Sequence, residues 1–139
     1  MTRSLPLAAV LGLMLTLAGH HPASSADRPA AADQPNYVHT VIFYLKKDAP
    51  RGADKALIDD AFTLLARIPT VKGIRAGLPA EKATPDVAVK DYQVGLLVLF
   101  DDYEGLKTYL DHPDHVKFVE KHLKHVDKVL VYDFVQARK

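Results

Sequence analysis

The stretch TYLDHPDHVKF, residues 108–118, carries two histidines on either side of a proline, with a tyrosine one helical turn before them. A neutral imidazole accepts protons near pH 7, and a phenol can donate a hydrogen bond to an oxygen on which negative charge develops. Pro113 suits the first position of a helix, which places His115 in the first turn, where the positive end of the helix dipole opposes protonation of its ring. His115 is therefore a candidate general base, and Tyr109 is its candidate electrophilic partner.

The same stretch also has a purely structural interpretation. Pro113 ends the preceding helical segment and pushes His112 towards an extended, cap-like conformation, while Asp114 falls where a helix favours negative charge. On this interpretation His112 and His115 only pack and cap a corner between two helices. The residues themselves leave both interpretations open.

Other kinds of site are disfavoured. His112, His115, His122 and His125 form two H-x-x-H pairs, but no acidic residue at helical spacing completes them, so we expect no metal. His122 and His125 follow lysines, and we expect them on a solvated face near a helix C-terminus. The chain has no cysteine, no glycine-rich phosphate loop, and serines only at positions 4, 24 and 25. We therefore expect neither nucleophilic catalysis nor a cofactor.

The N-terminus predicts export. Arg3 is followed by apolar residues 5–18 and then by small residues ending at Ala26, which is the order of a secretory signal peptide. The apolar run is shorter than the ~20 residues that span a bilayer. We therefore expect residues 1–26 to be removed and the protein to be secreted or periplasmic, with no membrane contact after cleavage. Residues 27–36 are small, polar and punctuated by prolines, and they predict a flexible leader.

The balance of charge gives no reason to expect a charged partner. Cleavage removes one of the 18 basic residues and none of the 17 acidic ones, which leaves no net charge. Such a balance does not favour binding to nucleic acid or to an anionic membrane. Since an exported domain without cysteine has no disulfides, its stability must come from packing.

The rest of the chain alternates strand and helix patterns. β-Branched and aromatic residues predict strands at 37–47, 70–78, 91–100 and 127–135. Apolar residues at helical spacing predict one helix at 53–68 and a second, broken at Pro113, within 101–126. This order is the α+β, ferredoxin-like βαββαβ plan. We expect it to form one domain, residues 37–136, with a polar tail at 137–139.

The predicted strands are apolar on both faces. An antiparallel sheet with one face in water would instead alternate apolar and polar residues, and two helices can cover only one face. A second copy of the chain is the simplest cover for the other face, so we expect a homodimer. The residues assigned to this outer face are Ile42, Tyr44, Leu97, Leu99, Leu130 and Tyr132.

Three stretches resemble the stress-responsive dimeric α/β barrel (Dabb) domain family. They are VHTVIFYLK at 38–46, LLVLFDDYEGLKTYLDHPDHVKF at 96–118 and DKVLVYDF at 127–134, and the motif YxxHPxHxxF is the most specific part. The resemblance implies a dimeric α/β barrel in which two ferredoxin-like protomers pack sheet against sheet. A plant polyketide cyclase of the family closes a ring by an intramolecular aldol condensation without a cofactor. By position, this implies catalytic roles for Tyr109 and His115 and a place in the pocket for His39.

These inferences combine into one hypothesis and one alternative. The hypothesis is a cofactor-free cyclase or lyase that acts on a small apolar carbonyl compound, polyketide-like or otherwise, with His115 as base and Tyr109 as its partner. The alternative is a non-catalytic small-molecule-binding or stress-protective homodimeric module. The residues expected to line the pocket are His39, Val41, Phe43, Ile58, Phe62, Leu96, Leu110, Phe118 and Val131.

Overall fold

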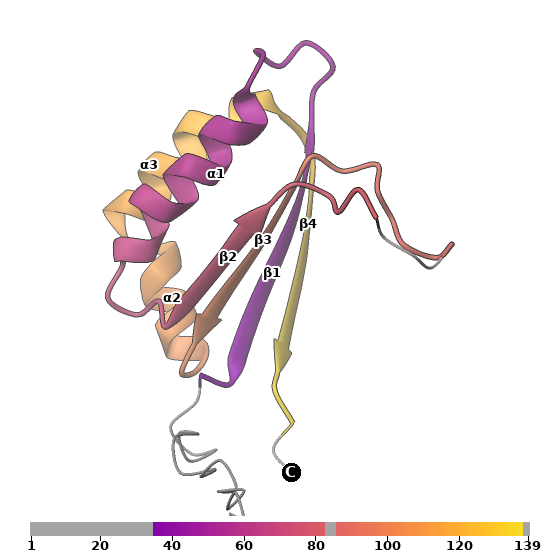
Figure 1. Ribbon diagram of the computed structural model, residues 1–139. Helices are drawn as coiled ribbons and strands as arrows, with labels where there is room; N and C mark the ends of the chain where they lie inside the picture. The colour runs from indigo at the N-terminus through magenta and orange to yellow at the C-terminus, as the bar shows by residue number, and fades with distance from the viewer. Residues whose placement is uncertain (1–34, 83–85, 138–139) are drawn as a thin grey trace, which may run out of the picture.

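The computed structural model describes residues 35–82 and 86–137 of the chain (Figure 1). The predicted signal peptide, residues 1–26, lies outside this part, as do residues 27–34 of the predicted leader. The last two residues of the predicted tail also lie outside it. The described part contains the expected domain except for residues 83–85.

The secondary structure follows the order expected from the sequence. The strands are β1 (Tyr37–Leu45), β2 (Gly73–Gly77), β3 (Val94–Phe100) and β4 (Val126–Val135). The α-helices are α1 (Ala53–Thr63), α2 (Tyr103–Leu110) and α3 (Pro113–His122). Two 3-10 turns extend the helical segments, η3 (Leu65–Arg67) after α1 and η4 (Leu123–His125) after α3. The predicted βαββαβ plan is confirmed.

The strands form one antiparallel sheet in the order β2-β3-β1-β4. This is the strand order of a ferredoxin-like fold, with β1 inside and with β2 and β4 at the edges. The register places His39 of β1 opposite Val98 of β3 on one side and Asp133 of β4 on the other. Residues that face each other across an antiparallel pair lie on the same face of the sheet. His39 and Asp133 therefore share one face.

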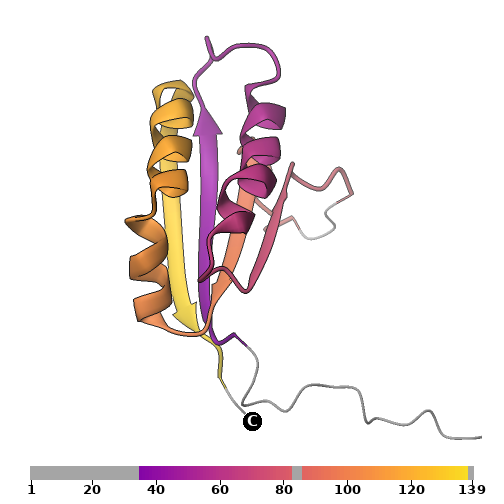
Figure 2. The same cartoon turned by 90° about the vertical axis from the view of Figure 1, so that its left-hand side faces the viewer.

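The helices all cover the same face of the sheet, as two views at right angles show (Figures 1 and 2). The segment formed by α2 and α3 runs beside α1 across this face. Between sheet and helices lies the apolar core, which contains one buried tyrosine. Its most deeply buried members are Leu57, Ala61, Leu65, Ile68, Val94, Val98, Phe100 and Tyr109.

The first helix is shorter than the sequence predicted. The apolar spacing indicated one helix at 53–68, but α1 ends at Thr63 and η3 carries the chain onward. The tighter turn still keeps Leu65 and Ile68 in the core, where they are 0% and 1% exposed. Burial of these apolar residues was therefore predicted correctly. The change from α-helical to 3-10 hydrogen bonding before Pro69 was not.

The corner between α2 and α3 is built by two caps. At the start of α2, Oδ1 of Asp102 accepts a hydrogen bond from the N–H of Gly105 at 2.8 Å. At the start of α3, His112 is extended and its Nδ1 accepts a hydrogen bond from the N–H of Asp114 at 3.1 Å, while Pro113 occupies the first helical position. The structural interpretation of this stretch is thus confirmed for His112. It also holds for His115, at the end of the other helix, because Nδ1 of His115 lies 2.9 Å from the carbonyl oxygen of Leu110, the last residue of α2.

The opposite face of the sheet carries no helix in the described part of the chain (Figure 1). Large apolar side chains of β4 lie on it, and Tyr132 and Phe134 are 56% and 53% exposed. Within residues 35–82 and 86–137, no helix has both the length and the apolar character needed to cross a membrane.

Candidate active site

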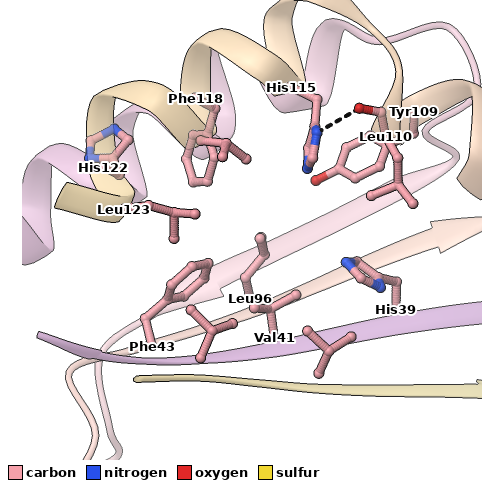
Figure 3. Close-up of a pocket in the computed structure, with 13 residues that line it drawn as sticks. His39, Val41, Phe43, Leu96, Tyr109, Leu110, His115, Phe118, His122 and Leu123 are labelled. Atoms are coloured by element: carbon pink, nitrogen blue, oxygen red, sulfur yellow. Dashed lines mark hydrogen bonds between the residues drawn. The ribbon is translucent and has the colours of Figure 1, made fainter. Parts of the chain in front are cut away.

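A cavity of about 240 Å³ lies between the sheet and the segment α2–α3 (Figure 3). Its walls are apolar apart from three histidines and one tyrosine. On the β4 side its wall includes Val129 and Val131, which are 37% and 50% exposed, so the cavity is open to solvent there. The lining residues are His39, Val41, Phe43, Leu96, Tyr109, Leu110, His115, Phe118, Val119, His122, Leu123, Val129 and Val131.

Tyr109 and His115 lie side by side at one end of this cavity (Figure 3). Tyr109 comes from the last turn of α2 and His115 from the first turn of α3, and the corner at Pro113 folds the two turns together. The ring centroids are 4.6 Å apart and the ring planes are tilted by 52°. The two side chains proposed from the sequence as base and partner are therefore in contact.

The tautomer of His115 follows from a single hydrogen bond. Its Nδ1 lies 2.9 Å from the carbonyl oxygen of Leu110 at the end of α2. A carbonyl oxygen can only accept, so Nδ1 carries a hydrogen, and in the neutral ring the lone pair lies on Nε2. The same bond satisfies a carbonyl that the end of α2 would otherwise leave without an intrahelical partner. His115 is therefore oriented as a base that acts through Nε2.

His115 is also kept neutral. Burial lowers its pKa below the ordinary value of 6.5, the hydrogen bond to the Leu110 carbonyl opposes this in part, and the nearby charge of His39 adds to the lowering. An imidazole with such a pKa is uncharged near pH 7 and can accept a proton there.

Tyr109 is a hydrogen-bond donor that holds its proton. The residue is 1% exposed, and its ring packs against Phe100 with the centroids 5.1 Å apart. Burial strongly raises the pKa of the Tyr109 hydroxyl. A buried phenol of this kind stays protonated and can stabilise negative charge on a neighbouring oxygen without giving up its hydrogen.

His39 approaches the same end of the cavity from the sheet (Figure 3). Its ring centroid lies 6.1 Å from that of Tyr109. Its Nδ1 is 2.7 Å from Oδ1 of Asp133 on the neighbouring strand β4. The carboxylate is acceptor-only when ionised, so it fixes the hydrogen on Nδ1 and leaves Nε2 of His39 for a ligand.

His122 corrects an expectation from the sequence. We expected it on a solvated face, but it is 5% exposed and lies at the other end of the cavity. Its Nε2 is 2.7 Å from Oδ2 of Asp60 on α1, and the Lys121 ammonium is 2.6 Å from the same oxygen. The reason is periodicity, since His122 follows His115 and Phe118 on the same face of α3. His125 is half-buried in η4, outside the cavity lining.

The structure brings together most of the residues predicted to form the site. Both proposed catalytic residues line the cavity, as do seven of the proposed pocket residues, His39, Val41, Phe43, Leu96, Leu110, Phe118 and Val131. Ile58 and Phe62 do not reach it. Ile58 packs against the core from α1, and Phe62 is 46% exposed, because the cavity lies under α2–α3 and not under α1.

The sequence did not predict the lining residues Val119, His122, Leu123 and Val129, nor Asp133, which binds His39. Asp133 has a signal of its own in the sequence. It follows Val129 and Val131 at a spacing of two along β4, so strand periodicity alone places its carboxylate on the inner, apolar face. An acidic residue on such a face calls for a partner, and His39 is that partner. In the part of the chain that the structure describes, no group of three or more His, Cys, Asp or Glu side chains is arranged to hold a metal ion.

Comparison with known proteins gives one family. Residues 38–136 match the family described as Dabb, the Stress responsive A/B Barrel Domain. No curated protein matches the chain. Among solved structures, a Dabb family protein with a ferredoxin-like fold from Mesorhizobium loti is 32% identical, with 76% of this chain and 100% of that chain covered and a TM-score of 0.60.

Two further structures are similar in fold alone. A hydroxynitrile lyase from Passiflora edulis is 18% identical, with 76% of this chain and 98% of that chain covered and a TM-score of 0.64. A dimeric ferredoxin-like protein of unknown function from Thermobifida fusca is 19% identical, with 74% of this chain and 92% of that chain covered and a TM-score of 0.62.

Proposed function

Because the chain belongs to the stress responsive A/B barrel domain family, we propose that it is a homodimeric, cofactor-free lyase or cyclase. Its substrate is a small apolar carbonyl compound, and its chemistry is proton transfer beside the carbonyl group. The observation that carries this proposal is the geometry of His115, whose Nδ1 is held by the Leu110 carbonyl 2.9 Å away while its ring contacts Tyr109.

The roles proposed for His115 and Tyr109 follow from the environments of their side chains. His115 is neutral because burial lowers its pKa, so Nε2 takes a proton from the carbon next to the substrate carbonyl. The electron pair of that C–H bond forms an enolate, whose oxygen receives a hydrogen bond from the Tyr109 hydroxyl. The raised pKa of Tyr109 keeps the hydrogen on the phenol while this charge develops.

The cavity sets the class of substrate. Its volume of about 240 Å³ suits a molecule of one or two rings, and its walls between the two ends are aliphatic and aromatic. Polar groups meet the ligand chiefly at the end formed by His39, Tyr109 and His115. An apolar body with a carbonyl at one end fits this distribution. The Passiflora edulis relative is a hydroxynitrile lyase, which supports lyase chemistry as something this fold can host.

Homodimerisation is proposed from the uncovered face of the sheet. Val38, Ile42, Leu97, Leu99 and Leu130 lie on that face in register across three strands. Contiguous apolar surface of this kind is rarely left in water. The Thermobifida fusca relative is dimeric, which supports a second copy as the cover.

A binding measurement tests the proposed site. We expect acetonaphthone, an apolar aryl ketone, to shift the amide resonances of β1, α2 and α3 in a ¹H–¹⁵N NMR titration and to leave those of α1 unchanged. Leu96→Trp fills the cavity from the sheet side and should abolish these shifts. Phe62→Trp, on the exposed side of α1, should preserve them. Shifts that survive Leu96→Trp would contradict binding in this cavity.

Exchange of the bound ketone's methyl protons in D₂O separates the two classes of function. Binding of the ketone without any proton transfer indicates the alternative, a non-catalytic binding module. The half-open wall at Val129 and Val131 favours exchange of ligands with solvent in either case.

A further inference from the structure

The cavity is lined in part by His39, whose Nδ1 lies 2.7 Å from Oδ1 of Asp133, and the proposed reaction gives this pair no role. Proton abstraction by His115 and hydrogen bonding by Tyr109 carry the reaction only to the enolate. Formation of a carbon–carbon bond then leaves negative charge on the oxygen of a second carbonyl, and that oxygen needs a proton. Tyr109 is a poor source, because burial raises the pKa of its hydroxyl.

Among the residues that line the cavity, the remaining titratable side chains are His39 and His122. His122 lies at the opposite end of the cavity, and its Nε2 is held by Asp60 at 2.7 Å. His39 lies under Tyr109, on the wall that faces His115 (Figure 3). In the described part of the chain its Nδ1 is bonded to Asp133 at 2.7 Å, while Nε2 has no hydrogen-bond partner there.

We propose that His39 and Asp133 form the proton-donating half of this site, a proposal that rests on the proposed function. Asp133 acts as a positioning residue. Its carboxylate holds the hydrogen on Nδ1 of His39, so that the ring presents Nε2 to the substrate, and it stabilises the imidazolium that forms when Nε2 is protonated. His39 touches the substrate and is the catalytic acid.

Formation of the carbon–carbon bond needs no reactant besides the two carbonyl groups and the two histidines. His115 Nε2 removes a proton from carbon, and the enolate carbon forms a bond to the carbon of a second carbonyl group, whose electron pair moves to oxygen. His39 Nε2–H gives its proton to that oxygen and becomes neutral. After the product leaves, the proton on His115 returns to His39 through water, so both rings regain their starting states. Cleavage of a β-hydroxyketone is the same sequence in reverse.

The environments of the two histidines suit these opposite roles. His115 has only a carbonyl and apolar groups against it, apart from Tyr109 and the charge of His39. His39 has a carboxylate, and the groups that face this pair are Asp133 from β4, Tyr109 from α2, His115 from α3 and Tyr37 from its own strand. A carboxylate thus lies beside the histidine on the sheet side of the cavity, whereas on the helix side burial lowers the pKa of His115.

Two activities measured on the same protein test the proposal. Exchange of the methyl protons of acetonaphthone in D₂O requires the base and the enolate-stabilising phenol. Cleavage of a β-hydroxyketone that releases a fluorescent naphthaldehyde also requires His39 to exchange a proton with the substrate hydroxyl. We expect Asp133→Asn to lower kcat for cleavage by about 100-fold, the scale of a general acid or base. KM and the exchange rate should change by a much smaller factor. Asp127→Asn, on the same strand and exposed, should change neither activity.

The outcomes separate this proposal from the proposed function. If His115→Gln leaves exchange as fast as in the wild type, the proposed function is contradicted. If His115→Gln abolishes exchange but Asp133→Asn cleaves the hydroxyketone as fast as the wild type, only the role of Asp133 and His39 is overturned. Asp133 is partly exposed, so Asp133→Asn should keep its thermal midpoint, and a melt run alongside the kinetics checks this.

A measurement without turnover tests the tautomer directly. In ¹⁵N NMR spectra of the wild type at high pH, neutral His39 should carry its hydrogen on Nδ1, and Asp133→Ala should release this preference towards the Nε2–H form that free histidine favours. If neutral His39 carries its hydrogen on Nε2 in the wild type, the assignment of Nε2 as the donating atom is overturned whatever the kinetics show.

Discussion

The ring centroids of Tyr109 and His115 lie 4.6 Å apart across the corner that Pro113 makes between α2 and α3. The corner alone brings a phenol from the end of one helix to an imidazole at the start of the next. The Leu110 carbonyl, one residue beyond Tyr109, then fixes the tautomer of His115. A short stretch of chain thus supplies a base, its orientation and a hydrogen-bond donor.

The first prediction concerns the Tyr109 hydroxyl. Tyr109→Phe keeps the buried ring and its packing against Phe100, but it removes the donor that stabilises the enolate. We expect proton exchange into a bound ketone to slow by about 100-fold, the scale of one lost donor to a developing oxyanion, with a thermal midpoint close to that of the wild type. Tyr103→Phe, on the exposed start of α2, is the matched control. Equal exchange rates in all three proteins would show that the phenol has no part in the reaction.

The second prediction concerns the link between α1 and α3. Burial would raise the pKa of Asp60, but hydrogen bonds from Lys121 and His122 and their charges outweigh it and lower that pKa below 3.8. The link therefore stabilises the fold above pH 3.8, and this stability is lost as the pH falls through the lowered pKa. We expect Asp60→Asn to reduce the free energy of unfolding by about 2 kcal/mol at pH 7, as for a lost charge-assisted hydrogen bond.

Urea unfolding at pH 7 and at pH 2 measures this effect. The difference between wild type and Asp60→Asn should shrink at the lower pH, because the wild-type carboxylate takes up a proton as the pH falls through its lowered pKa. The neighbouring Asp59→Asn, on the exposed side of α1, should change stability little at either pH. A constant difference across the pH range would mean that the charge of Asp60 is not what stabilises the pairing of α1 with α3.

The third prediction concerns the uncovered face of the sheet. Leu130 of the edge strand β4 lies opposite Ile42 on this face, and a lysine there would place an unpaired charge in the proposed dimer interface. We expect wild type to be a dimer by light scattering at micromolar concentration and Leu130→Lys to be a monomer or to unfold. Thr63→Lys adds the same charge to an exposed helix end and should leave the dimer intact. A stable, monodisperse wild-type monomer would refute the proposal.

The fourth prediction concerns export. The order of Arg3, an apolar run and small residues up to Ala26 leads us to propose cleavage after Ala26 and a location outside the cytoplasm. Intact-mass measurement of the protein expressed from its full sequence should give a chain that begins at Asp27. A chain that retains Met1 in a membrane fraction would indicate an uncleaved anchor instead.

The fold was predictable because its signals are local and repeated. Alternation in β1 and β3 and the helical spacing of Leu57, Ala61 and Leu65 gave the element order, and the motif around His112 and His115 gave the family, which the comparison over residues 38–136 confirms. The incorrect pocket predictions, Ile58 and Phe62, depended on how the helices pack on the sheet. Nothing in the spacing within α1 says that Ile58 and Phe62 lie away from the cavity, since that depends on where α2–α3 crosses the sheet.

The site was predictable in part for the same reason. Tyr109 and His115 are close in sequence, so a local motif identified them together. Asp133 and Asp60 are far in sequence from the histidines they bind, His39 and His122. Strand register fixes the first pair and helix packing fixes the second, and neither is visible in a local pattern.

The central claim is that His115 removes a proton from carbon, and deuterium exchange measures that step without knowledge of the natural substrate. We expect wild type to catalyse incorporation of deuterium into the methyl group of acetonaphthone, followed by NMR in D₂O. The rate should fall below pH 6.5 as His115 becomes protonated, because burial lowers its pKa from that value. His115→Gln should reduce the rate to that of buffer while it still binds the ketone. Exchange by His115→Gln at the wild-type rate, or no exchange by a wild type that binds the ketone, would contradict the account.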